Sequence, residues 1–206
     1  MTHLSARRKS LCQTSLLCCA LLGPTGQQAM AQTVLPTATT LPSDSLYRLS
    51  IALTDAQGHR FDWHDQIGRA QLVTMFYGDC RTACPLVLQT LQQTVTAAHL
   101  LPQQLGVTMV SLDPLHDTPS SLTALAQSHH LDPAVFRLAV AADDSHTRML
   151  AAVLNIQYRS RANGEISHTT RVLLLDTNGR VVASSTALGA TPDPEFLKQI
   201  QSITKS

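Results

Sequence analysis

The features that this sequence lacks argue against several classes of protein before any motif is considered. The main apolar stretch, residues 11–22, has about 12 residues, whereas about 20 are needed to cross a bilayer. Beyond residues 7–9 there is no cluster of basic side chains, so nucleic acid is a poor candidate partner. No glycine-rich phosphate loop, Ser-His-Asp set or nucleotide motif is present. Length and apolar content otherwise suit a single globular domain.

The N-terminus has the three parts of a secretory signal peptide. Basic residues at 7–9 precede the short apolar stretch 11–22, and residues 29–31 read Ala-Met-Ala, a small-x-small cleavage site. We therefore expect residues 1–31 to be a signal peptide, cleaved after Ala31, and the mature protein to be periplasmic or otherwise exported. Membrane association is expected only if this segment is not cleaved.

Cysteine is scarce in the expected mature chain. Of five cysteines, Cys12, Cys18 and Cys19 lie in the signal segment, and neither Cys18 nor Cys19 follows the small residue typical of lipoprotein signals. Only Cys80 and Cys84 remain, and a bridge between them would close a very short loop. The pair Cys80 and Cys84 is therefore expected to have a chemical role rather than a structural one.

Cleavage would also remove three basic residues and no acidic ones, which changes the formal charge from +1 to −2.

The two cysteines lie in a predicted strand-to-helix turn. Residues 71–77 are apolar and β-branched, as in a buried strand, and residues 85–99 carry apolar side chains at helical spacing. Pro85 suits the first helical position, which places Cys84 at or beside the N-cap. The amides and partial positive charge of a helix N-terminus favour thiolate over thiol. Two such sulfurs indicate either redox exchange or a soft metal.

The rest of the chain reads as a tether followed by one α/β domain. Residues 32–44 are rich in Thr, Pro and Ala and are expected to form a flexible tether, with the domain over 45–206. Strands alternate with helices before a final hairpin and helix, which predicts a thioredoxin-like three-layer sandwich with a mixed sheet and an N-terminal hairpin. The further strands are expected at 47–53, 60–63, 106–112, 135–140, 171–175 and 180–183, and the further helices at 119–128, 143–154 and 193–203.

Three motifs in combination resemble the Sco/SenC family of thioredoxin-fold copper-binding proteins. They are Phe-Tyr-x-x-Cys-x-x-x-Cys-Pro at residues 76–85, Asp-Pro-x-x-Asp-Thr-Pro at 113–119, and a histidine before the final hairpin. The resemblance implies that Cys80, Cys84 and His168 bind one copper ion. It also implies a copper metallochaperone, rather than an enzyme, that delivers copper to the dinuclear copper site of a respiratory oxidase. Its partners would be the copper-accepting oxidase subunit and a thiol reductant.

The chemistry of these side chains agrees with that implication. Thiolates are soft ligands that select Cu(I), whereas an imidazole adds affinity for Cu(II). Three protein ligands leave a coordination position open, so the ion can be passed on. An oxidised Cys80–Cys84 pair would lose both thiolates, so copper loading would require reduction.

One departure from the family pattern keeps an alternative open. Arg81 stands where the family often has an internal proline, and Asp79 adds an acid beside Cys80. A cation beside a thiolate can favour nucleophilic attack as well as copper binding. The alternative is a thiol-disulfide oxidoreductase in which Cys80 and Cys84 are the redox-active pair. Against it, residues 167–171 lack the proline that oxidoreductases of this fold carry, and three residues rather than two separate the cysteines. A copper-sensing module is a third class.

Two aspartates in the 113–119 block have separate expected roles. Asp113 is expected at the carboxyl end of a strand beside the cysteine strand, close to the copper site. Asp117 is expected to cap the following helix together with Thr118. His116 is expected to be a loop residue.

Overall fold

The computed structural model describes residues 40–80, 83–161 and 164–203. The expected signal peptide and most of the expected tether, as well as Arg81 and Thr82, lie outside the described residues. The described end of the tether contacts the domain, because Arg180 Nε donates to Asp44 Oδ2 at 3.1 Å. Among the described helices, none combines the length and apolar character that a membrane crossing requires.

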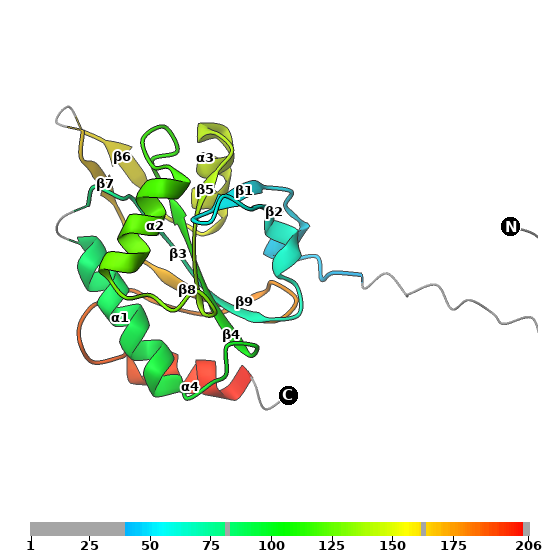
Figure 1. Cartoon of the computed structure of the whole chain (residues 1–206). Coiled ribbons are helices and arrows are strands. Elements are labelled where there is room, and N and C mark those ends of the chain that lie inside the picture. Colours follow the sequence, from blue (N-terminus) through cyan, green and yellow to red (C-terminus); the bar gives the residue numbers. More distant parts are fainter. Residues whose placement is uncertain (1–39, 81–82, 162–163, 204–206) are drawn as a thin grey trace, which may run out of the picture. The chain divides into compact units, whose positions relative to one another are not determined.

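A seven-stranded mixed sheet forms the centre of the domain (Figure 1). Its strand order is β2-β1-β5-β4-β3-β8-β9; the pairs β3–β4 and β4–β5 are parallel, and the other pairs are antiparallel. All seven residues of β3 and of β4 are buried, as expected for central strands. The strands are β1 (Ala52–Asp55), β2 (Arg60–Asp62), β3 (Ala70–Phe76), β4 (Leu105–Ser111), β5 (Phe136–Ala141), β8 (Val172–Leu175) and β9 (Val181–Ser185).

Helices cover both faces of the sheet and bury alternate strand residues. On one face α1 (Ala83–Ala98), α2 (Pro119–Ser128) and α4 (Pro194–Ile203) pack over Leu72 and Phe76. On the other face α3 (Asp144–Val153) and the 3₁₀ helices η1 (Leu46–Arg48) and η2 (Trp63–Gln66) pack over Val73 and Met75. Successive side chains of β3 therefore enter two separate cores, which gives the expected three layers.

Local capping chemistry explains where two helices begin. The Thr118 hydroxyl accepts from Ser121 N, and the Ser121 side chain accepts from Thr118 N, which closes a capping box at the start of α2. The Asp143 carboxylate accepts from His146 N at 2.9 Å at the start of α3. These boundaries match the sequence-based expectation, including Pro119 at the first helical position.

Three details differ from the sequence-based expectation. The first part of the predicted strand 47–53 is instead the 3₁₀ helix η1, because the Ser45 hydroxyl accepts from Tyr47 N and caps that helix. The Tyr47 side chain is buried in the core. Helix α1 begins at Ala83, so Cys84 lies inside the first turn rather than at the N-cap. A separate two-stranded sheet, β6 (Tyr158–Ser160) and β7 (Ile166–His168), was not predicted, since three-residue strands carry too little pattern.

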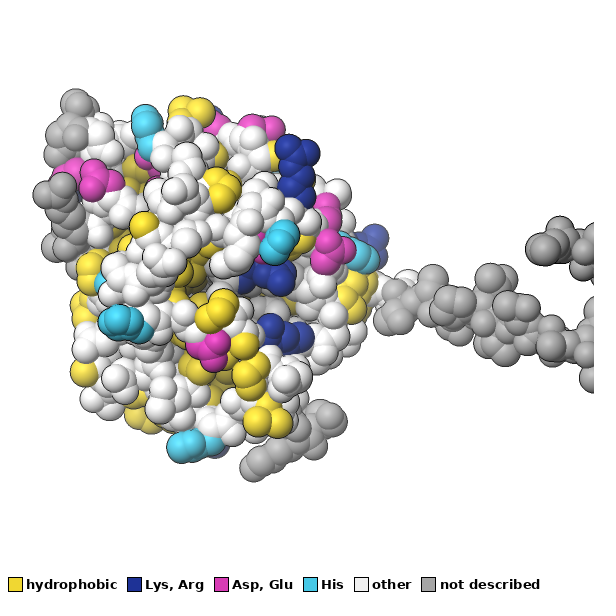
Figure 2. Space-filling model, in the orientation of Figure 1, with side chains coloured by type: hydrophobic (Ala, Val, Ile, Leu, Met, Phe, Trp, Pro, Cys, Tyr) yellow, Lys and Arg dark blue, Asp and Glu magenta, His cyan; other side chains and the backbone are white. Residues whose placement is uncertain are grey.

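Charged side chains are dispersed on the face drawn in Figure 2, where basic, acidic and histidine side chains form small separate groups.

The parallel pairing of β3 and β4 brings two segments with candidate functional residues together. The segment after β3 holds the cysteines, and the segment after β4 holds residues 113–118. Because the carboxyl ends of neighbouring parallel strands share one edge of the sheet, these two segments meet there.

Candidate metal centre

The cysteine segment turns tightly from β3 into α1. Cys80 N donates to Tyr77 O at 3.3 Å, which closes the turn after the strand. Cys84 N, in the first turn of α1, donates to Cys80 Sγ at 3.3 Å. A helix amide is therefore directed at the first sulfur, as anion-binding helix N-termini do. The second sulfur, Cys84 Sγ, lies 3.5 Å from Tyr77 O and donates to it.

His168 reaches the same region from the last position of β7, opposite Tyr158 of β6. Its ring lies edge-on to Tyr77, with centroids 6.0 Å apart and planes at 84°. His168 Nδ1 is 3.2 Å from Thr169 O. A carbonyl can only accept, so this contact requires the proton on Nδ1. Nε2 is then left with its lone pair, and it is buried with no hydrogen-bond partner among the described residues.

The fold brings the three side chains together. One potential ligand atom from each of Cys80, Cys84 and His168 lies within 4.8 Å of the others. Cys84 is 3% exposed, whereas Cys80 is partly buried. Cys80 and His168 also line a cavity of about 290 Å³ together with Tyr77 and residues 165–167. The donor set is therefore two sulfurs and a buried imidazole nitrogen, open to a cavity on one side.

Burial controls the protonation of this cluster in the metal-free protein. It raises the pKa of the Cys84 thiol, and the neighbouring Cys80 sulfur adds to the increase. Burial also raises the pKa of Tyr77 to about 12, with a further contribution from its hydrogen bond to Cys80. Burial lowers the pKa of His168, which keeps the imidazole neutral at pH 7. The expectation that the helix N-terminus makes Cys84 a thiolate is therefore wrong for the metal-free protein, because desolvation outweighs the helix dipole.

The difference between the two cysteines gives a testable prediction. In the reduced, metal-free protein, iodoacetamide should modify Cys84 more slowly than Cys80, because Cys84 is the more buried of the two and burial raises the pKa of its thiol. Mass spectrometry of timed samples measures both rates. Equal rates in the folded protein would contradict the assigned burial of Cys84, and equal rates in denaturant are the control.

Asp117 holds the cysteine segment in place, a role that the sequence did not reveal. Its carboxylate Oδ2 accepts from Gly78 N at 2.9 Å and from the Ser111 hydroxyl at 2.5 Å. Asp117 is buried, and a Cβ at Gly78 would collide with its carboxylate. The absence of a side chain at position 78 thus permits the close approach. The N-cap of α2 is Thr118 alone, so the expected capping role of Asp117 is not observed.

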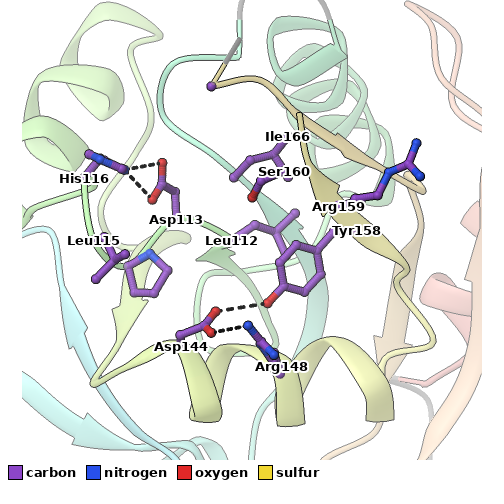
Figure 3. A pocket seen from close by; sticks show the side chains of 12 residues that line it. Leu112, Asp113, Leu115, His116, Asp144, Arg148, Tyr158, Arg159, Ser160 and Ile166 are labelled. Atoms are coloured by element: carbon purple, nitrogen blue, oxygen red, sulfur yellow. Dashed lines mark hydrogen bonds and ion pairs between the residues drawn. The ribbon is translucent and has the colours of Figure 1, made fainter. Parts of the chain in front are cut away.

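Asp113 and His116 belong to a neighbouring cavity of about 460 Å³. Figure 3 shows the Asp113 carboxylate paired with His116, whose Nδ1 lies 2.7 Å from Oδ1. Across the same cavity, Asp144 contacts Arg148 and the Tyr158 hydroxyl. Asp117, rather than Asp113, therefore contacts the cysteine segment, through Gly78 N. Of the residues expected near the metal, the structure groups only Cys80, Cys84 and His168 within the part of the chain it describes.

The architecture and this site define a thioredoxin-like domain with a Cys-Cys-His cluster. A family model described as SCO1/SenC matches residues 42–205, which is most of the chain. The chain therefore belongs to the SCO1/SenC family, as the motifs predict. The comparison with curated protein sequences gave no significant match.

Solved structures confirm the fold at low sequence identity. A SCO1/SenC family lipoprotein from Bacillus anthracis is 20% identical, with a TM-score of 0.69 over 75% of this chain and 93% of that chain. ScoI from Bradyrhizobium japonicum, solved with copper bound, is 20% identical, with a TM-score of 0.61 over 75% and 98%. BsSco, described as a cytochrome c oxidase assembly protein with a disulfide switch, is 16% identical, with a TM-score of 0.62 over 76% and 92%.

Proposed function

We propose that this protein binds one copper ion through Cys80 Sγ, Cys84 Sγ and His168 Nε2 and delivers it to the dinuclear copper site of a respiratory oxidase. The observation that carries the proposal is the convergence of three potential ligand atoms within 4.8 Å. Two sulfurs and an imidazole suit copper in both of its common oxidation states. ScoI of Bradyrhizobium japonicum, which shares this fold, was solved with copper bound.

The hydrogen bond of His168 supports its proposed role as a ligand. Thr169 O fixes the proton on Nδ1, which leaves Nε2 as the donor, and this second contact is of the kind that orients metal-bound histidines. Copper would replace the proton on Cys84, and its positive charge would stabilise the thiolate that burial otherwise disfavours. The cavity beside Cys80 and His168 leaves one side of the cluster approachable by a recipient.

Delivery is tested by mixing the copper-loaded protein with the metal-free copper-binding domain of an oxidase subunit. We expect the visible spectrum of the dinuclear copper site to appear in the recipient, and the donor to lose its copper. The same preparation, free of metal, should show negligible reductase turnover on a protein disulfide. Brisk turnover without copper, together with weak copper binding, would favour the thiol-disulfide oxidoreductase instead.

Replacing His168 with alanine should weaken Cu(II) binding more than Cu(I) binding. The imidazole is the nitrogen ligand that Cu(II) prefers, whereas both thiolates remain to hold Cu(I). Competition titrations with chelators for each oxidation state measure the two affinities. His116→Ala is the matched control, because His116 pairs with Asp113 in the neighbouring cavity. Unchanged affinities in both states would remove His168 from the site.

Oxidation of the two cysteines to a disulfide should abolish tight copper binding. A disulfide has no thiolate to donate, so only the imidazole contact would remain. Copper titration of the oxidised protein, before and after treatment with dithiothreitol and removal of the reductant, measures the effect. Retention of tight binding in the fully oxidised form would contradict the proposed ligand set.

The proposed role agrees with a location outside the cytoplasm. An exported compartment favours disulfides, so a thiol reductant would have to keep the pair reduced for copper loading. Export agrees with the signal-peptide pattern of residues 1–31, and the Bacillus anthracis relative is a lipoprotein. Membrane attachment of this protein would depend on whether its N-terminal segment is retained.

A further inference from the structure

Buried polar atoms without partners mark a second region, remote from the metal cluster along β3. Apart from His168 Nε2, four such side-chain atoms occur among the described residues, and all four can donate a hydrogen bond: Tyr47 Oη, Trp63 Nε1, Gln66 Nε2 and Arg69 Nε. They belong to η1, η2 and the turn that leads into β3, whereas the cysteines follow the other end of that strand. An anion accepts hydrogen bonds, so it could bind to buried donors that have no acceptor within the protein.

Arg69 provides a fixed positive charge in this region. Its Nη2 donates to Leu105 O at 2.7 Å and to Ala134 O at 3.1 Å, so the guanidinium is anchored to two segments of backbone. Burial lowers the pKa of Arg69, and the nearby charge of Arg137 lowers it further. No ion pair within the described part of the chain includes either arginine. Arg137 instead lies over the Phe61 ring, with its Cζ 4.6 Å from the ring centroid, so neither guanidinium group has a carboxylate within ion-pair distance among the described residues.

Two of these four donors belong to residues that line a cavity of about 130 Å³, namely Gln66 and Arg69, and Arg137 lines it as well; Tyr47 and Trp63 do not. Gln66 is only 5% exposed, and the Thr108 hydroxyl donates to its Oε1 at 2.6 Å. This bond fixes the amide so that Nε2 remains available. Two further lining residues carry acceptors: Asp65, whose Oδ2 accepts from Asp62 N in the cap of η2, and Gln71, whose Oε1 accepts from the Thr108 hydroxyl at 3.3 Å.

Gly106 makes room for the arginine. A Cβ at this position would lie within 3 Å of Gln71 Oε1 and of Arg69 Cζ and Nε. The chain therefore has no side chain where one would displace the guanidinium from the cavity. On the face drawn in Figure 2, basic side chains lie in and beside a hollow near the centre of the view.

We propose that this cavity is a binding site for a small oxyanion of the phosphate type, held by the Gln66 amide and by the guanidinium groups of Arg69 and Arg137. A planar guanidinium presents paired donors that match an oxyanion, and anchoring through Nη2 leaves Nε–H to bind the ligand. The ligand would neutralise the two arginines and satisfy the two buried donors. The site uses none of the metal ligands, so it is independent of copper.

The test is a titration of the reduced, metal-free protein with inorganic phosphate, with chloride at matched ionic strength as the reference. We expect a saturable shift of the Arg69 Nε–H resonance in ¹⁵N spectra, with a Kd in the millimolar range or below. We also expect Tm to rise by a few degrees, because a ligand that binds only the folded state stabilises it by mass action. Chloride should produce neither effect.

Three variants distinguish a specific phosphate-binding site from general charge screening. Arg137→Gln should remove most of the phosphate response. Gln66→Glu should abolish the response and raise Tm without phosphate. Its carboxylate would itself bind the guanidinium groups of Arg69 and Arg137 in place of phosphate. Lys198→Gln on α4 removes the same charge away from the cavity and should respond like the wild type. No saturable shift of the Arg69 resonance, or an equal response in all four proteins, would overturn the proposal.

Discussion

Replacing either Cys80 or Cys84 with serine is expected to lower the Cu(I) affinity by more than about 100-fold, the upper range for changes that only affect the groups around a ligand. A hydroxyl is a hard, neutral donor and cannot replace a soft thiolate at Cu(I). The double variant should show no tight binding at all, because only the imidazole would remain. Competition with a Cu(I) chelator measures each affinity.

Serine at position 84 should leave the fold intact, which makes the loss of copper interpretable. Its hydroxyl can still donate to Tyr77 O, the acceptor of the Cys84 thiol. Ser167→Ala is the matched control, because Ser167 lines the same cavity beside His168 but supplies no expected ligand. Tight Cu(I) binding by the double cysteine variant, or equal loss in the Ser167 control, would contradict the ligand assignment.

The sequence predicted the central elements because their patterns are strong. The run 71–77 is mostly apolar, and β3 occupies Ala70–Phe76 with every residue buried. Thr118 and Pro119 form a local start signal, and α2 begins where they place it. Asp-Thr-Asn-Gly at 176–179 is a turn signal between the strands expected at 171–175 and 180–183, and the structure contains the expected hairpin as β8 and β9.

The grouping of the site was predictable only through the family resemblance. Nothing in the local pattern around His168 places it beside Cys84, since β7 has three residues and pairs only with the equally short β6. The pKa of Cys84 was misjudged for a related reason. A helix N-terminus is visible in the sequence, whereas the burial that outweighs it depends on packing from distant segments.

The role of Asp117 was hidden because its neighbours in sequence offered a simpler explanation. An aspartate before Thr-Pro resembles a helix cap, but its carboxylate points away from α2, toward Gly78 N and the Ser111 hydroxyl. Both partners lie near the carboxyl ends of β3 and β4, which are adjacent in the sheet. A glycine two residues before the first cysteine was the available sequence signal, since a Cβ there would strike Asp117.

Asp117→Ala is expected to lower both stability and copper affinity. It leaves the Gly78 N–H and the buried Ser111 hydroxyl without their acceptor, at a cost on the order of 2–4 kcal/mol in total. For a domain of this size, Tm should fall by roughly 5–15 °C. Because the same bond holds the segment that carries Cys80, Cu(I) affinity should also fall, by about 10- to 100-fold.

Two further variants decide whether these losses come from the two hydrogen bonds of Asp117. Asp117→Asn should recover most of the stability and copper affinity, because its amide oxygen can accept from the same two donors. Asp113→Ala should change Tm and copper affinity little, because the contact that it removes, with the exposed His116, is a surface interaction of a kind worth about 1 kcal/mol or less. Thermal unfolding and Cu(I) competition on all three proteins measure both quantities. If Asp113→Ala lowers copper affinity as much as Asp117→Ala does, the hydrogen bonds from Gly78 and Ser111 do not position the cysteine segment.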